Sequence, residues 1–118
     1  MDHNLKFKPG QAVTFATTTA AKGGDVAEIT GNRTVGLAAA ASVKAIGTYA
    51  HDVAIGDDVV VHIAGPIDTF VASAAIPAGS EIEAAGAGRV RVRTTGRSLG
   101  LALTAATAAG DIVQALRV

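Results

Sequence analysis

Residues 81–93 read EIEAAGAGRVRVR, and this stretch decides the fold class. Arginine and valine alternate through Arg89–Arg93, so a β-strand here would carry Val90 and Val92 on one face and three arginines on the other. The glycine-rich turn Gly86–Gly88 joins this strand to Glu81–Glu83, which predicts a β-hairpin. We expect both glutamates on the polar face beside the arginines, where each cross-strand ion pair contributes roughly 0.2–1 kcal/mol.

The arginine row is also the main local concentration of positive charge. Arg89, Arg91 and Arg93, with Arg97 beyond them, could grip phosphates, but no aromatic residue is interleaved among them to stack on bases. Two interpretations remain. The row is either a solvated strand face paired with the two glutamates or an electrostatic contact face for an acidic protein partner.

A short phrase of glycine, a polar residue and an aliphatic residue recurs along the rest of the chain. Glycine tolerates the positive φ of a tight turn, Asp or Ser bonds back to the local backbone, and a β-branched residue starts a strand. This spacing of turns predicts an all-β protein: a compact small β-barrel or β-sandwich of short strands with Gly-Asp turns and little helix. The copies are Gly10–Val13, Gly24–Val26, Gly56–Val59, Gly79–Ile82 and Gly110–Ile112.

Two glycine-containing strands continue alike. Ile46-Gly47 is followed nine residues later by Gly56-Asp57, and Leu99-Gly100 is followed ten residues later by Gly110-Asp111. This is a weak internal repeat of roughly 50 residues. Two related halves of one barrel explain it, and chance similarity in a chain of low complexity is the alternative.

Helix is scarce by the same signals. The alanine-rich runs 37–44 and 104–109 are short and lack an apolar stripe, although alanine has the highest helix propensity. We therefore expect each run to be a strand end that leads into a loop, with at most one or two helical turns.

The composition bounds the class of protein and its partners. The 118 residues fit one domain, which we place at 10–118, behind an extended N-terminal arm at 1–9 for which a frayed terminus is the alternative. The absence of cysteine excludes a disulfide framework, and ten basic residues against ten acidic ones argue against a protein that coats nucleic acid. Charged residues make up 17% of the chain, below the usual roughly 25%, which indicates a surface that other protein covers.

No apolar run approaches the roughly 20 residues that a membrane helix requires, and the N-terminal residues lack the apolar core of a signal peptide. We expect no membrane association, and synthesis in a cytoplasm.

The sequence carries no recognisable active-site motif. His3, His51 and His62 lack the spacing of a metal site, and the acidic pair Asp57-Asp58 lacks the further oxygen ligands of a calcium loop. The chain shows no nucleophile–base pair, phosphate cradle or cofactor motif. We therefore expect no enzyme, no catalytic residue, no metal and no cofactor, and we interpret the histidines as surface or interface residues.

The end of the chain resembles a known family. Residues 97–118, RSLGLALTAATAAGDIVQALRV, contain a Gly-aliphatic-Ala strand, an alanine-rich loop, Gly-Asp and a closing strand. This order resembles the C-terminal signature of the small capsid decoration (head cement) proteins of tailed bacteriophages. The resemblance extends over nearly the whole chain from about Lys8, through the earlier segments 10–14, 24–26, 31–38 and 76–80.

The resemblance implies a structural virion protein made in the bacterial host. It implies a β-barrel-like domain that binds the major capsid protein on the outer surface of the expanded head, often as a homotrimer, and stabilises the shell by bridging capsomers. We expect the arm to grip the capsid by adding a strand to it, with the arginine row as a possible second contact. The arm residues concerned are Leu5, Lys6, Phe7, Lys8 and Pro9.

Two other classes stay open. A ligand- or carbohydrate-binding β-module displayed on a virion or cell surface usually exposes Trp and Tyr for stacking on sugars, and Tyr49 is the one such residue here. A small enzyme with an unrecognised site is the third class.

Overall fold

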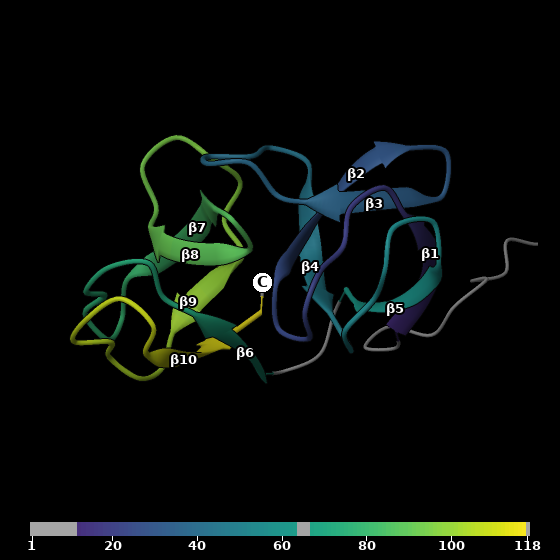
Figure 1. Ribbon diagram of the computed structural model, residues 1–118. Helices are drawn as coiled ribbons and strands as arrows, with labels where there is room; N and C mark the ends of the chain where they lie inside the picture. The colour runs from purple at the N-terminus through teal and green to yellow at the C-terminus, as the bar shows by residue number, and fades with distance from the viewer. Residues whose placement is uncertain (1–11, 64–66, 118) are drawn as a thin grey trace, which may run out of the picture.

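The computed structural model describes residues 12–63 and 67–117, and each regular element in these two ranges is a β-strand (Figure 1). The predicted all-β class is confirmed. The run 37–44 starts at the last residue of a strand and continues as a loop, the run 104–109 lies in a loop, and neither contains a helical turn. Within the described ranges no helix is long and apolar enough to cross a membrane. The strands are β1 (Ala12–Thr17), β2 (Val26–Gly31), β3 (Thr34–Leu37), β4 (Ala45–Tyr49), β5 (Asp58–His62), β6 (Ile67–Val71), β7 (Glu81–Gly86), β8 (Arg89–Val92), β9 (Gly100–Ala102) and β10 (Ile112–Leu116).

The first five strands form a closed barrel in the order β1-β3-β2-β4-β5. β5 pairs antiparallel with β1, where Phe15 lies opposite Val59, and β1 runs parallel to β3, where Ala16 lies opposite Thr34. Residues 12–63, which contain this barrel, are called the first half below. Its core consists of alternating inward residues, as a half-buried strand requires: Val13, Phe15, Ala21, Ala27, Val35, Tyr49, Val59 and Val61.

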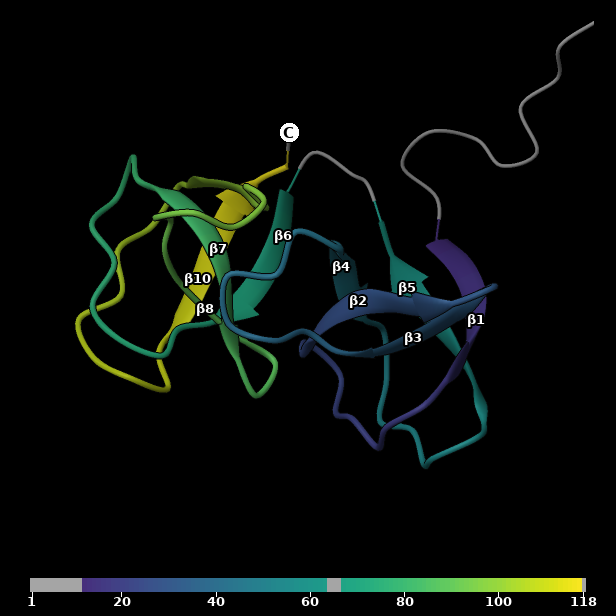
Figure 2. The same cartoon turned by 90° about the horizontal axis from the view of Figure 1, so that it is seen from above.

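The last five strands form a second sheet in the order β6-β10-β9-β7-β8. A single parallel bridge between Ala72 and Val90 connects the end of β6 to β8. In the first half the corresponding strands, β1 and β3, form a parallel ladder instead. Residues 67–117 are called the second half. The two halves lie side by side, with β4 and β6 at their boundary (Figure 2).

The internal repeat is real, but the prediction of two halves of one barrel is wrong. Each half forms its own sheet, and the two sheets have the same strand connections: a hairpin (β2-β3 or β7-β8), a pair that follows it (β4-β5 or β9-β10) and a first strand beside the last. The sequence spacing could not decide whether the strands form one sheet or two, because a repeat specifies equivalent strands and leaves their partners open.

Two glycines of the repeat occupy equivalent places where strands come closest. A Cβ added at Gly47 would lie 1.9 Å from the carbonyl oxygen of His62, and one added at Gly100 would lie 2.4 Å from that of Leu116. Since no side chain fits at those distances, glycine lets the strand after the hairpin cross the end of its neighbour, as a small barrel requires.

The two halves share part of their interior. The core of the second half is built around Phe70, Ile76, Ile82 and their neighbours, but it also includes Val26, Ala38 and Ala45 of the first half. Apolar burial therefore joins the two sheets as well as stabilising each of them.

Candidate functional site

The hairpin expected from residues 81–93 forms as β7 and β8. Glu83 lies opposite Arg91 and Ala84 opposite Val90, with a register shift before the Gly86–Arg89 pair at the turn. Val90 is fully buried, as expected. Val92 is not a core residue, because it ends the strand and remains 39% exposed.

The prediction that Glu83 lies on a solvated polar face is wrong. Its side chain is completely buried because the chain folds back over it after β8. One carboxylate oxygen accepts hydrogen bonds from the backbone N–H groups of Thr94, Thr95 and Gly96 at 2.7–3.1 Å. The other accepts from Arg91 Nε at 2.8 Å and from the Thr94 hydroxyl at 3.1 Å.

This network sets the ionisation of Glu83. Burial alone would raise the pKa of its carboxyl group, but the hydrogen bonds from Thr94, Gly96 and Arg91 outweigh that effect and lower the pKa from 4.5 to about 2. Glu83 is therefore an ionised structural anchor for the loop at 94–96. Its surroundings do not suit a general acid or base at neutral pH.

Two of the three arginines in the row are engaged within the chain. Arg91 contacts Glu83, while Arg93 Nε donates to the carbonyl oxygen of Gly96 at 2.8 Å, and its guanidinium lies 3.7 Å from the Glu81 carboxylate. Arg89 is exposed, and within residues 12–63 and 67–117 its side chain has no ion pair. The row as an electrostatic contact face stays a prediction, and Arg89 is the member with the most accessible charge.

An exposed apolar row crosses the second sheet and escaped the sequence interpretation. Leu116 lies opposite Ile67 on one side and Leu101 on the other, so these three side chains share one outer face. Their exposed fractions are 40%, 55% and 36%, and Ile112 on the same strand face is 67% exposed. Alternation along Ile112-Val113-Gln114-Ala115-Leu116 was the available signal, but it does not say which face is covered. Contiguous exposed apolar side chains of this kind mark interaction surfaces.

Arg117 connects the two halves, and the sequence interpretation did not predict this contact. Its guanidinium donates to Asp68 Oδ2 at 3.3 Å and to the carbonyl oxygens of Ile46 and Ile63 at 3.0 and 3.2 Å. Asp68 also accepts from the Thr48 hydroxyl at 2.9 Å. Burial lowers the pKa of Arg117, opposed by the charge of Asp68. Nothing in the sequence near Arg117 signals this role, since its partners are distant in the chain.

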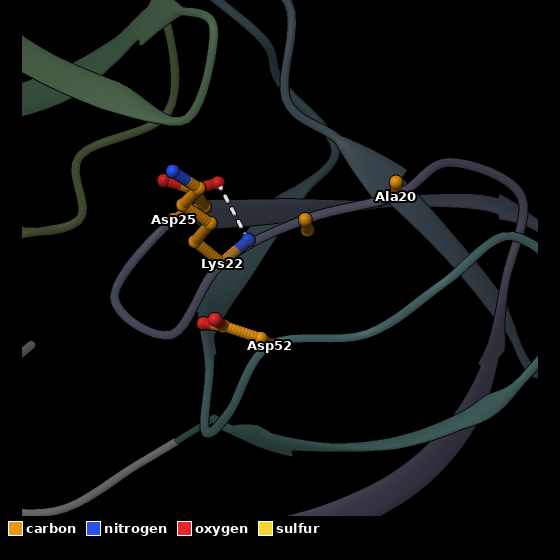
Figure 3. A pocket seen from close by; sticks show the side chains of 5 residues that line it. Ala20, Lys22, Asp25 and Asp52 are labelled. Carbon is orange, nitrogen blue, oxygen red and sulfur yellow. Dashed lines mark hydrogen bonds between the residues drawn. The ribbon is translucent and has the colours of Figure 1, made fainter.

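The surface hollow drawn in Figure 3 is lined by Ala20, Ala21, Lys22, Asp25 and Asp52. Its two carboxylates serve the backbone: Asp25 Oδ2 accepts from the Lys22 N–H at 3.0 Å, and Asp52 Oδ1 accepts from the Gly23 N–H at 2.9 Å. They hold a turn, as the Gly-Asp phrase predicted for Asp25, and do not form an acid–base pair.

The remaining candidate residues form no cluster. Within the part of the chain that the structure describes, no group of three or more His, Asp or Glu side chains could hold a metal ion. His51, His62, Asp57 and Asp58 are exposed. His3 and the predicted arm, Leu5 to Pro9, lie outside the described residues.

One family model covers nearly the whole chain, and a solved structure shares its fold. The family model described as phage cement protein matches residues 7–118. The fold is similar to the crystal structure of the N base of head fiber gp8.5 in bacteriophage phi29, with a TM-score of 0.73 and 17% sequence identity over 91% of this chain and 92% of that chain. No curated protein matches the chain.

Proposed function

This chain belongs to the phage cement protein family, a family of capsid-associated structural proteins of the virion, and from that premise we propose that it binds the outer surface of a phage head and stabilises the expanded shell. It acts as a homotrimer that bridges neighbouring capsomers, and it is made in the cytoplasm of the bacterial host. The observation that carries this proposal is the family match over residues 7–118.

The mechanism is thermodynamic. A protein that binds the assembled, expanded lattice but not free capsid subunits stabilises that lattice by mass action. The stabilising free energy grows with the logarithm of the ratio of the protein's free concentration to its dissociation constant. Each copy that bridges two capsomers also resists their separation under the pressure of packaged DNA. Neither effect needs a reactive side chain.

The N-terminal arm is the proposed primary contact with the capsid. Leu5 and Phe7 alternate with Lys6 and Lys8 ahead of Pro9, which is the pattern of a strand with one apolar and one basic face. Addition of such a strand to a sheet edge of the capsid protein supplies backbone hydrogen bonds and pockets for alternate side chains.

The arginine row is the proposed second contact. Arg91 and Arg93 are held by Glu83 and Gly96, so Arg89 is the residue of the row best placed to meet an acidic capsid surface. A rim contact of this kind contributes more to association rate and orientation than to affinity.

A carbohydrate-binding module is the weaker proposal. Tyr49 is 1% exposed, and its hydroxyl lies 3.0 Å from Thr17 Oγ1 inside the first half. Phe15 and Phe70 are also buried, so no Phe or Tyr ring among the described residues is exposed for stacking on a sugar.

The direct test mixes the purified protein with expanded heads that lack decoration and counts bound copies by cryo-electron microscopy. We expect stoichiometric density at junctions between capsomers, a higher temperature of head disruption, and little binding to unexpanded heads used as the control. Absence of density on expanded heads at saturating protein would overturn the proposal.

A further inference from the structure

One side of the second sheet is aliphatic and uncharged. Side chains of β6, β10 and β9 alternate between core and surface, and the ladder register places the outward ones beside one another. The exposed side chain of Gln114 lies at the centre of this side, because β10 is the middle strand and Gln114 its middle outward residue, opposite Thr69. We call this surface the aliphatic face; the aliphatic residues around Gln114 are Ile67, Val71, Leu101, Leu103, Ile112 and Leu116.

The first half supplies an internal comparison, because its ladders have the same register. The corresponding pairs are Thr48–His62 and Leu101–Leu116, and Ala16–Asp58 and Val71–Ile112; the bond Ala50 N–H to Val60 O corresponds to Leu103 N–H to Gln114 O. At the aliphatic positions aligned in this way the first half carries smaller or more polar residues, namely Ala16, Thr48, Ala50, Asp58 and His62. The shared fold therefore does not require aliphatic residues there. Only the centre is reversed, with Val60 in the place of Gln114.

The aliphatic face is open where the equivalent surface of the first half is partly covered. Thr48 is 2% exposed, since Asp68 of the second half accepts a hydrogen bond from its hydroxyl, while Leu101 in the same position is 36% exposed. Exposed aliphatic side chains that are contiguous across three strands mark a surface that another molecule covers.

A second copy of this chain is the occupant that the charges favour. A side chain near a rotation axis lies beside its own copies, so a charged residue there repels itself. A surface that surrounds such an axis should therefore carry no charge, and none of the described outward residues of β6, β10 and β9 is charged. The equivalent surface of the first half, with Asp58 and His62, does not meet this condition.

The proposed contacts with the capsid lie elsewhere. The arm precedes β1, which lies on the side of the first half away from the second sheet in both views (Figures 1 and 2). The arginine row belongs to the hairpin β7-β8, and an acidic surface that suits this row gains nothing from an uncharged aliphatic one. The zero net charge of the chain also gives little repulsion between copies, so they can meet through this face before any head is present.

We propose that copies of this chain associate through the aliphatic face, with Gln114 beside the symmetry axis and the aliphatic residues packed around it. This inference deepens the proposed homotrimer and rests on it, since it names the surface on which the three copies meet. It also accounts for the polar residue at the centre: an amide side chain both donates and accepts, so Gln114 can be satisfied by its own copies.

Charge at the axis gives the sharpest test. Gln114→Glu changes an amide into a carboxylate of nearly the same shape, and Gln114→Lys puts the opposite charge in the same place. Each variant alone should repel itself, so we expect sedimentation to show a dissociation constant raised about tenfold or more over wild type. An equimolar mixture of the two variants should recover association as mixed oligomers. Variants that dissociate without recovery in the mixture would overturn the position of Gln114 at the axis.

An exchange between the halves tests the aliphatic residues. The triple variant Leu101→Thr/Ile112→Asp/Leu116→His carries the residues of the equivalent first-half positions, which the same fold accommodates. We expect it to sediment as a monomer with unchanged circular dichroism.

Ile55→Asp is the matched control for that exchange, because it puts the same charge on an isoleucine of the first half that is 71% exposed. It should remain associated. Equal dissociation of the triple variant and of Ile55→Asp would overturn the role of the aliphatic face.

The state of the free wild type separates failure of this inference from failure of the proposed function. A wild-type trimer that the Gln114 variants and the triple variant leave intact overturns the aliphatic face and leaves the homotrimer standing. A wild-type monomer overturns both, while binding to expanded heads is measured separately.

Two further outcomes would assign the face to another occupant and overturn the proposal. A triple variant that stays trimeric but loses binding to heads would make the face a capsid contact. Dissociation of the trimer on deletion of residues 1–8 would make the arm its occupant.

Discussion

Glu28 and Glu83 occupy the same position in the two halves, and each anchors the loop that follows its hairpin. Glu28 Oε1 accepts from the Ala39 N–H at 3.1 Å and from the Ser42 hydroxyl at 2.7 Å. Glu83 Oε1 accepts from the Thr94 N–H at 2.9 Å, with Thr95 and Gly96 added. The repeat therefore preserves a polar anchor as well as the strand order.

Glu83→Ala should destabilise the protein more than Glu28→Ala. Removal of the fully buried carboxylate leaves several amide groups and the Arg91 charge without their partner, so we expect a loss of about 3 kcal/mol. Glu28 is half-buried and accepts two bonds, so its loss should cost about 1 kcal/mol. Urea unfolding measures both, and equal losses would contradict the ranking.

Acid should weaken the wild type through Glu83. The folded pKa of about 2 lies below the ordinary 4.5, so the unfolded chain takes up the proton first as the pH falls. The contribution of Glu83 to stability is therefore complete above pH 4.5 and is lost progressively as the pH falls toward 2.

Thermal unfolding of the wild type and Glu83→Gln across this window measures the effect. The wild type should lose more stability on acidification than the variant, which cannot titrate at this position. The pKa of Asp111 is also lowered, by hydrogen bonds from the Thr107 hydroxyl and the Thr107 and Ala108 amides, and it acts in the same direction in both proteins. Parallel curves for the two proteins would count against the role of Glu83.

Gly47→Ala should be among the most damaging small substitutions in the first half. The added Cβ would meet the His62 carbonyl oxygen at 1.9 Å, so strands β4 and β5 must separate, at a cost of about 3 kcal/mol. Gly56→Ala is the matched control: nothing lies within 4 Å of its Cβ, and its φ of 86° alone costs about 1–2 kcal/mol. Chemical denaturation compares them, and a milder effect at Gly47 than at Gly56 would refute the steric argument.

Arg117→Ala should loosen the contact between the halves. It removes the donors to Asp68, Ile46 O and Ile63 O and leaves buried acceptors, at a cost of about 3 kcal/mol. Arg117→Lys retains the charge without the planar set of donors and should recover only part of the loss. Hydrogen exchange should quicken around β4 and β6 before it quickens in the hairpin β7-β8, and uniform quickening would argue against a local role.

Deletion of residues 1–8 should abolish binding to expanded heads while leaving the fold and the oligomer intact. The proposed arm supplies the strand that pairs with the capsid, and the described core begins after it. Co-sedimentation with heads measures binding, while circular dichroism and sedimentation of the free protein serve as controls. Undiminished binding by the shortened protein would remove the arm from the proposal.

The hairpin and the turns could be predicted because their information is local. The alternation in Arg89–Arg93 and the glycine-rich turn specify a hairpin whichever sheet it joins. The Gly-Asp phrase specifies a turn in which the carboxylate accepts nearby amides, as Asp111 does from Thr107 and Ala108.

The candidate surfaces could be predicted only in part. The sequence carries a signal for Glu83 that its interpretation did not use, since Gly24, Glu28 and Gly31 recur with the same spacing as Gly79, Glu83 and Gly86. Its burial was not, because a loop beyond the strand covers it. The exposed row through Leu101 and Leu116 also depends on strand partners that local patterns do not name.

By itself the sequence determined the all-β class, the hairpin and the turns, because each follows from backbone preferences within a few residues, and it indicated a repeat without separating it from chance similarity. Only the tertiary structure decided that each half forms its own sheet, that Arg117 joins the halves, and that Leu101 is exposed where Thr48 is covered. Those outcomes depend on which distant segments meet, and pairing over such distances is decided by the burial of the whole chain.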